Sequence, residues 1–416
     1  MAPQRRLLHL STLVQENTAA VDAYVAKSGL AEPSFEPSAP LAWDLPPDIE
    51  AARNAALEAL DELREHLLGP TQNIVSRVVD MGSLISLHAI VKFNIASHLP
   101  ISGGISVPDL AQVCNMHVED LDIIVRHGIT RRLFLLHQDG KIGHSALSRA
   151  LVDVPVLRTF VAGVSGNLWT ALPRIVEVME KYPGSQEMEE SAYRLAYGNT
   201  FWEDFEAHPQ KGKDFAGAMT FFLQNPALDI GFVHEYDWSR HANGTVVDLG
   251  GSKGEVAFTL AQRYPDMKFI VQDRAEIVAL APKEKPANVE FQAHDFFAEQ
   301  PLRGADVYFF RWIMHDWSAK YCVKILQALR PALKHKTRIV LMETILPEPG
   351  VLRPYQERMV RNFDVVMKAT FNAKERTEAD WRTIIASADE EGRFSVVDVQ
   401  RPAGSQLGFL VVEWTG

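Results

Sequence analysis

The sequence predicts an α/β fold in which a mainly helical N-terminal half precedes a mostly parallel sheet with an antiparallel edge. After about residue 240, short apolar runs alternate with helical patterns, which is typical of βαβ units. The chain then ends in two apolar runs, 394–399 and 407–414, joined by a short loop. Such a pair favours antiparallel strands at the edge of the sheet.

Composition narrows the class of protein. The 416 residues are 47% hydrophobic and 23% charged, which is ordinary for a soluble protein of two or three domains. The net charge of −11 disfavours binding to nucleic acid. The only cysteines, Cys114 and Cys322, exclude a disulfide framework or a cysteine-rich metal site, so we expect a cytoplasmic protein without a metal. Charged residues interrupt the most apolar stretch, 78–96, and we expect no membrane span.

The N-terminal half shows helical periodicity. A short amphipathic helix is expected over 5–30, followed by a proline-rich linker and a second helix that starts at Asp48 and ends at Gly69-Pro70. Residues 105–150 predict two helices and a small hairpin, as in a winged helix. Because residues 101–160 hold six basic and six acidic side chains, we expect this module to be structural or to cover the substrate, and not to read DNA.

The second half predicts the order of the sheet. We expect parallel strands over 245–249, 268–272, 289–292, 306–310 and 337–342, with helices over 255–263, 276–280 and 320–333.

A glycine-rich turn follows the first of these strands. Gly250, Gly251 and Gly254 permit a tight turn and close approach of a ligand to the backbone. Asp248 precedes this turn and would repel a pyrophosphate, so the ligand should be cationic and free of phosphate. S-adenosylmethionine carries an ammonium and a sulfonium, which favours a methyltransferase over a dehydrogenase.

Two further acids follow the next strands. Asp273 ends the second strand, where a carboxylate can accept hydrogen bonds from both ribose hydroxyls, and Asp295 follows the third strand. Acids at the carboxyl ends of successive strands should converge on the ligand crevice of such a sheet. The alternative is that these acids are solvated helix caps.

A second group of residues predicts proton transfer. His315 lies in a His-Asp-Trp segment after the fourth strand, Glu343 ends the fifth, and Glu375 lies in Lys-Glu-Arg-Thr. A histidine oriented by carboxylates can take the proton of a weakly acidic phenol. The alternatives are a core histidine, a surface carboxylate and a helix entry with Thr377 as its cap.

These motifs, in this order, resemble the caffeate-type family of S-adenosylmethionine-dependent O-methyltransferases, and most of all its fungal secondary-metabolite branch. The resemblance implies a C-terminal Rossmann-like class I methyltransferase sheet and an N-terminal half that dimerises. It implies that His315 is the general base and that Glu343 and Glu375 hold its ring. It assigns to the cofactor site Asp248, Gly250, Gly251, Asp273, Asp295, Phe296 and Arg311.

Apolar side chains outside these motifs predict an acceptor pocket. Together with Asp316, which we expect in the same pocket, these side chains suggest a planar, apolar acceptor. For each apolar side chain, packing in the core is the alternative. The candidates are Trp202, Met219, Phe222, Met367 and Phe371. We expect methylation of a phenolic or enolic hydroxyl on a small aromatic or polyketide-like natural product.

Four segments follow from this interpretation: a dimerising helical segment over 1–100, a winged-helix-like module over 101–160, a helical connector over 161–235 that contributes to the substrate pocket, and the S-adenosylmethionine-binding catalytic domain over 236–416. Two other functions stay open. The cofactor could act only by its charge, as in a pericyclase that keeps the methyl group, or the chain could be a regulator on the same fold.

Overall fold

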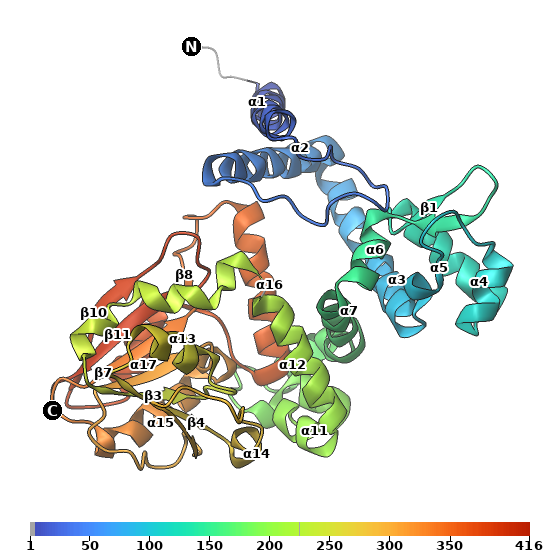
Figure 1. Cartoon of the computed structure of the whole chain (residues 1–416). Helices are drawn as coiled ribbons and strands as arrows, with labels where there is room; N and C mark the ends of the chain where they lie inside the picture. The colour runs from blue at the N-terminus through green and yellow to red at the C-terminus, as the bar shows by residue number, and fades with distance from the viewer. Residues whose placement is uncertain (1–4, 224) are drawn as a thin grey trace. The chain divides into compact units, whose positions relative to one another are not determined.

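A computed structural model describes residues 5–223 and 225–416, without the side chains of residues 216, 220, 222 and 223. The chain divides into two compact units (Figure 1). The first holds Met1–Trp169, Lys213–Ala218 and Arg353–Glu357, and the second holds Thr170–Gly212, Met219–Leu352 and Arg358–Gly416.

The first unit is mainly helical, as predicted. Its elements are α1 (Arg6–Ser28), α2 (Pro47–Val79), α3 (Met81–Lys92), α4 (Val107–Cys114), α5 (Val118–Thr130), β1 (Phe134–Leu136), β2 (Ile142–His144), α6 (Ala146–Asp153), α7 (Pro155–Ala162) and a π-helical segment (Gly163–Leu168). The predicted end of the second helix at Gly69-Pro70 is wrong. Gly69 leaves the helical region with φ 68°, but Pro70 starts a new helical turn directly, because its fixed φ suits that position. The result is a kink and not an end.

Several helices precede the sheet of the second unit in the sequence. These are α8 (Trp169–Ala171), α9 (Ile175–Lys181), α10 (Ala192–Tyr197), α11 (Phe201–Ala207) and α12 (Pro209–Leu223). A capping box starts α11, where Thr200 accepts a hydrogen bond from the amide of Glu203, whose side chain accepts one from the amide of Thr200. Lys213–Ala218, in α12, and the start of α16 belong to the first unit.

A seven-stranded sheet dominates the second unit, in the order β10-β11-β7-β6-β3-β4-β5. Five adjacent strands, β7, β6, β3, β4 and β5, are parallel to one another. Strand β11 pairs antiparallel with β7 and with the edge strand β10. The strands are β3 (Thr245–Leu249), β4 (Lys268–Asp273), β5 (Val289–Ala293), β6 (Val307–Arg311), β7 (Arg338–Glu343), β10 (Phe394–Gln400) and β11 (Gly408–Trp414). The predicted parallel sheet with its antiparallel edge is confirmed.

Helices cover both faces of this sheet (Figure 1). The connecting elements are α13 (Glu255–Arg263), α14 (Ala275–Val278), α15 (Ala319–Leu329), β8 (Ile345–Leu346), α16 (Pro354–Phe371), β9 (Arg376–Thr377) and α17 (Glu378–Ser387). Helices α15 and α17 pack on one face, and α13 packs on the other. Because alternate residues of a strand point to opposite faces, Val247 and Tyr308 join the first layer while Val246 and Phe309 join the second. Burial on both faces explains why these strands read as continuous apolar runs.

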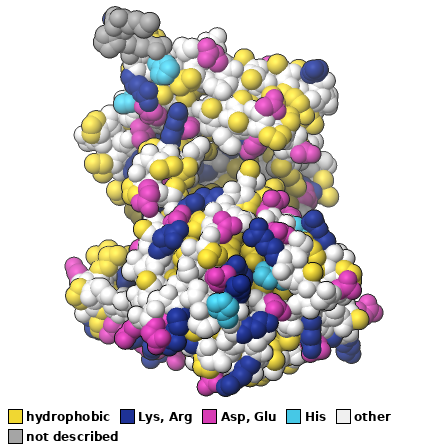
Figure 2. All heavy atoms as spheres, turned by 90° about the vertical axis from the view of Figure 1, so that its left-hand side faces the viewer, with side chains coloured by type: hydrophobic (Ala, Val, Ile, Leu, Met, Phe, Trp, Pro, Cys, Tyr) yellow, Lys and Arg dark blue, Asp and Glu magenta, His cyan; other side chains and the backbone are white. Residues whose placement is uncertain are grey.

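The first unit exposes many apolar side chains on α1, α2 and α3. Those with a large exposed fraction include Leu8, Leu67, Ile74, Val78 and Val79. Figure 2 shows such hydrophobic side chains exposed over the part of the molecule that carries the N-terminus. Within the described residues, the helical stretch Pro47–Lys92 is long and apolar enough to cross a membrane by length and composition alone, and only 11% of its most apolar window is buried.

Candidate active site

His315 lies on a single 3₁₀ turn, Met314–Asp316, just beyond the carboxyl end of β6. Trp312 precedes this turn with φ 55°, a left-handed conformation that is rare for a bulky residue, and its amide donates to the carbonyl of Met342 on β7. The Trp312 ring stacks on the imidazole, with centroids 5.4 Å apart and planes 16° apart. The imidazole is therefore buried and fixed on one side by an aromatic ring.

Glu375 contacts the imidazole directly. Its Oε1 lies 2.8 Å from Nδ1 of His315, and both side chains are buried. This bond selects the tautomer with the proton on Nδ1, so Nε2 carries the lone pair of the neutral ring. Nε2 makes no hydrogen bond to any described residue, and Asp316 Oδ1 lies 3.5 Å from it.

Glu343 holds the same turn through its backbone. Its Oε1 accepts hydrogen bonds from the amides of Ile313 at 2.9 Å and Met314 at 2.7 Å. Its Oε2 is buried and has no hydrogen-bond partner among the described residues. The structure thus brings the three predicted catalytic residues together, but Glu343 acts on the segment that carries the imidazole and Glu375 acts on the ring itself.

Charge at this cluster favours a protonated imidazole. Burial alone would lower the pKa of His315, but the carboxylates of Asp316, Glu375 and Glu343 raise it to about 10. Burial raises the pKa of Glu343 to about 7 and that of Asp316 to about 6, although the imidazolium acts in the opposite direction on both. Such a cluster releases a proton from His315 readily only when further positive charge is close by.

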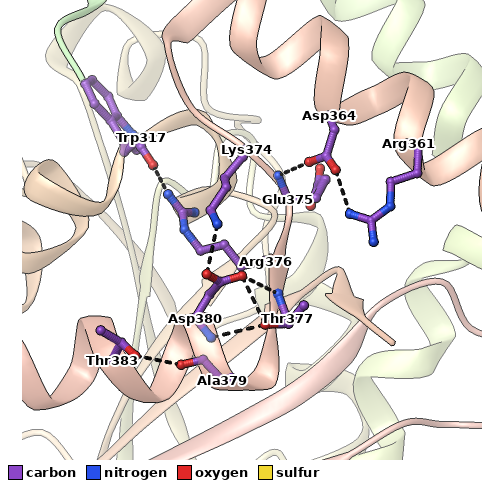
Figure 3. Close-up of polar contacts among 10 residues, drawn as sticks. All are labelled: Trp317, Arg361, Asp364, Lys374, Glu375, Arg376, Thr377, Ala379, Asp380 and Thr383. Atoms are coloured by element: carbon purple, nitrogen blue, oxygen red, sulfur yellow. Dashed lines mark hydrogen bonds and ion pairs between the residues drawn. The ribbon is translucent and has the colours of Figure 1, made fainter. Parts of the chain in front are cut away.

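The Lys-Glu-Arg-Thr segment, Lys374 to Thr377, makes further polar contacts near this cluster, and Figure 3 shows several of them. The amide of Glu375 donates to Asp364 Oδ1 at 2.8 Å, and Asp364 pairs with Arg361. Arg376 is buried and donates to the carbonyls of Met314 and Trp317. Neither Asp364 nor Arg376 was predicted as a site residue, although Arg376 stands within the Lys-Glu-Arg-Thr motif.

Thr377 caps α17, which was the alternative interpretation of this segment. Its hydroxyl accepts from the amide of Asp380 at 3.2 Å, and Asp380 accepts from the amide of Thr377 at 3.0 Å (Figure 3). The segment therefore serves both as a helix entry and as the support of His315.

The glycine-rich turn takes the conformation that its composition requires. Gly250 has φ 71°, and a Cβ there would lie 2.6 Å from Cδ1 of Ile313. A Cβ on Gly251 would lie 2.6 Å from Oδ2 of Asp248. Neither position accepts a side chain, so the backbone of the turn stays open to a ligand beside Asp248.

The acids after the strands lie in different environments. Asp248 is buried, and its Oδ2 has no partner among the described residues. Burial, together with the nearby Asp273, raises the pKa of Asp248 to about 7. Asp273 accepts from the amides of Ser252 at 2.9 Å and Arg274 at 2.8 Å, and burial raises its pKa. A buried carboxylate oxygen without a partner is suited to binding a cationic ligand, and S-adenosylmethionine is such a ligand.

The remaining predicted cofactor residues are more scattered. Asp295 is exposed and accepts from the amide of Phe297 at 3.0 Å, so it shows no contact with the other two acids. Phe296 packs edge-on against Trp317, with centroids 5.8 Å apart. Arg311 donates from Nη2 to the carbonyl of Leu228 at 2.8 Å, and the nearby Asp248 and Glu343 counter the lowering of its pKa by burial.

An apolar cavity of about 190 Å³ lies beside Trp317. Its lining comprises Met188, Glu189, Thr200, Trp202, Trp317, Ser318, Tyr321 and Phe371. Trp202 stacks on Phe371 with centroids 5.7 Å apart, so two of the predicted pocket residues meet here. Among the described residues, Met219 and Met367 do not line it, and the side chain of Phe222 lies outside the described part of the chain.

Known proteins are similar to this chain in sequence and in fold. A family model described as an O-methyltransferase domain matches residues 181–389. The grayanic acid biosynthesis cluster O-methyltransferase of Cladonia grayi is 37% identical over 97% of this chain and 87% of its own. The chlorophenol O-methyltransferase of Trichoderma longibrachiatum is 32% identical over 99% of this chain and 91% of its own.

Solved structures agree on the fold. The crystal structure of OxaC gives a TM-score of 0.78 at 20% identity, over 99% of this chain and 100% of that one. A structure described as a pericyclic reaction enzyme gives 0.72 at 21% identity, over 96% and 100%. At such identities the likeness shows the fold alone.

Fold and site together define an S-adenosylmethionine-dependent methyltransferase. The chain belongs to the O-methyltransferase family, and it is similar to fungal members of secondary metabolism over nearly its whole length.

Proposed function

We propose that this enzyme methylates a phenolic or enolic hydroxyl of a small aromatic or polyketide-like natural product, with His315 as the general base. The observation that carries the proposal is the 2.8 Å contact between Glu375 and Nδ1 of a buried His315, which leaves Nε2 as the basic atom. A base positioned in this way contributes typically ~10²–10⁴-fold to the rate.

The residues around His315 suit each part of this reaction. The acceptor hydroxyl would give its proton to Nε2 of His315, and Glu375 would stabilise the resulting imidazolium. S-adenosylmethionine supplies the electrophilic methyl group when it is bound. We assign its cationic part to Asp248 beside Gly250 and Gly251, and its ribose to Asp273.

We extend this assignment to the rest of the predicted cofactor and pocket residues. Asp295 and Phe296 would lie at the adenine, and Arg311 would hold the wall between Asp248 and Glu343. Asp316, 3.5 Å from Nε2, would face the acceptor.

The acceptor class rests on the aromatic cavity and on a relative. The rings of Trp202 and Phe371 stack with their planes 26° apart, which favours a planar apolar ligand. The relative from Trichoderma is named for a chlorophenol, which is a phenolic acceptor. Met219, Met367 and Phe222 remain predicted pocket residues.

We further propose that the protein is a cytoplasmic homodimer. The exposed apolar face of α1, α2 and α3 supports a dimer, because monomers rarely leave so much apolar surface uncovered. Its two cysteines are free and buried, which suits a reducing compartment.

The four predicted segments are part of this proposal, with 1–100 dimerising, 101–160 forming the winged-helix module, 161–235 contributing to the pocket and 236–416 carrying catalysis. In the module, α4 and α5 precede the antiparallel β1–β2 hairpin, and Ile105 bridges to Ile142.

Replacing His315 by Gln tests the proposed base. With a phenolic acceptor panel, we expect loss of S-adenosylhomocysteine release and of the product heavier by one methylene, while the cofactor still raises the melting temperature. His335→Gln, at an exposed histidine, is the matched control and should keep full turnover. A folded His315→Gln enzyme with wild-type turnover contradicts the assignment. A product of altered skeleton and unchanged mass would instead indicate the pericyclase alternative.

A further inference from the structure

Arg376 belongs to the buried cluster around His315, and the proposed reaction gives it no role. Its side chain is 1% exposed, and its guanidinium forms no ion pair with any described residue. Burying a guanidinium without a carboxylate partner is costly, because the charge loses its water and gains only neutral acceptors. We therefore expect other contacts of Arg376 to offset this cost.

The hydrogen bonds of Arg376 bracket the catalytic turn. Nη1 donates to the carbonyl of Met314 at 3.0 Å, and Nη2 donates to the carbonyl of Trp317 (Figure 3). These two carbonyls stand immediately before and after the pair His315-Asp316. The planar guanidinium fits both carbonyls at once, which a lysine ammonium cannot do in the same geometry.

A second donor reaches the same two carbonyls. The thiol of Cys322, on α15, lies 3.2 Å from the Met314 carbonyl and 3.3 Å from the Trp317 carbonyl. Arg376 is also held from its far side, since its guanidinium lies 4.9 Å from the centre of the Trp381 ring on α17. The turn is therefore clamped between α15 and the segment that enters α17.

The backbone of Arg376 connects both carboxylates to this clamp. The preceding residue is Glu375, which contacts Nδ1 of His315. Arg376 itself pairs with Ile345 in the short parallel ladder of β8 and β9, two residues after Glu343. Arg376 thus links the turn that carries His315 to Glu375, which contacts the imidazole, and to the strand segment that follows Glu343.

We propose that Arg376 is a positioning residue that fixes the imidazole of His315 relative to Glu375 by clamping the carbonyls of Met314 and Trp317. This inference rests on the proposed role of His315 as the base. If Arg376 only filled space, its replacement would alter stability and leave the proton affinity of His315 unchanged. If it positions the ring, its replacement loosens the contact between Nδ1 and Glu375, and the pKa of His315 falls toward its ordinary value.

Arg376→Lys and Arg376→Gln test this inference in the full-length enzyme. We expect kcat to fall about 10–100-fold, which is the effect of displacing a base by up to about 1 Å. The KM for S-adenosylmethionine should stay within about twofold of the wild-type value. In Arg376→Lys, which keeps the positive charge, the acid limb of the pH profile should move to lower pH, as should the titration of His315 followed by NMR of labelled imidazole. Arg303→Lys is the control, because Arg303 is exposed and pairs only with Glu299 among the described residues.

The outcomes separate this inference from the proposed function. A folded Arg376→Lys enzyme with unchanged kcat overturns the inference, and so does a fall in kcat with no movement of the acid limb or of the imidazole titration. Retained turnover in His315→Gln overturns the proposed function instead, whatever Arg376→Lys does. Cofactor-induced thermal shifts show that each variant is folded, and Arg376→Lys keeps the charge should Arg376→Gln fail to fold.

Discussion

At the scale of single residues, the active site is a balance between one imidazole and three carboxylates. Asp316, Glu343 and Glu375 all favour the charged form of His315, and burial opposes it. A base in this environment holds its proton tightly in the cofactor-free protein. We expect the positive charge of a bound methyl donor to counter the carboxylates, which would couple cofactor binding to proton release from His315.

The first prediction concerns this balance. Because the base must be neutral, and the carboxylates raise the pKa of His315 to about 10, kcat/KM should rise with pH from neutral into the alkaline range. Asp316→Asn removes the largest raising charge, so its acid limb should lie at lower pH. Glu299→Gln, which changes an exposed carboxylate paired with Arg303, is the control. An identical profile for Asp316→Asn and wild type would contradict the electrostatic account.

The second prediction concerns Asp248. Its pKa is raised to about 7 from an ordinary value near 3.8, so ionisation in the folded state costs stability. The cost is absent below pH 3.8, grows as the pH rises to about 7, and is then constant at an order of a few kcal/mol. Asp248→Asn should therefore raise the melting temperature of the cofactor-free protein, more so at pH 7 than at pH 5.

The same variant should lose most of the thermal shift that S-adenosylmethionine produces, because the carboxylate that meets its positive charge is gone. A lower melting temperature for Asp248→Asn at both pH values would show that the carboxylate has a partner that stabilises it.

At the scale of elements, the cap of α17 links stability to catalysis. Thr377→Ala removes the capping hydroxyl and should cost about 1 kcal/mol, or about 2–4 °C in melting temperature for a unit of this size. Because Glu375 lies two residues before the cap, we also expect kcat to fall severalfold. Ser106→Ala removes the cap of α4 and should cost similar stability with wild-type kcat. Equal turnover in the two variants would contradict this link.

The elements also show what the sequence could predict. The strands of the sheet came out within one or two residues, because burial on both faces gives short apolar runs that glycines and acids delimit. The resemblance implied that Glu343 and Glu375 both hold the imidazole of His315. Glu375 contacts the ring as expected, whereas Glu343 accepts hydrogen bonds from the backbone of the turn. Arg376 was missed because its partners are backbone carbonyls distant in sequence, 62 residues away for Met314. Asp364 was missed because its partner at the site is a backbone amide, that of Glu375, which no pattern of side chains reveals.

Other differences have equally physical causes. Gly69 kinks a helix instead of ending it, because the following proline fits the first turn of a new one. Met219 and Met367 do not line the aromatic cavity: apolar type alone does not say which side of a helix faces a ligand.

At the scale of the whole molecule, the apolar face of the N-terminal helices calls for a partner. Ile74 is 65% exposed and Val78 is 59% exposed, one turn apart on α2. The variant Ile74→Glu/Val78→Lys should shift the protein from dimer to monomer in analytical ultracentrifugation, since burying charges at an apolar interface is unfavourable. Leu280→Glu, at an apolar residue 65% exposed outside these helices, should leave the mass unchanged. A monomeric wild type would contradict the proposed dimer.

The stack of Trp312 on His315 also gives the enzyme an internal optical probe. An imidazolium in van der Waals contact with an indole quenches its fluorescence more strongly than neutral imidazole does. The chain has eight tryptophans, so the difference spectrum between wild type and Trp312→Phe isolates the emission of this ring. Its intensity should brighten as the proton leaves the base, and it would let the arrival of donor and acceptor be followed in real time without any label.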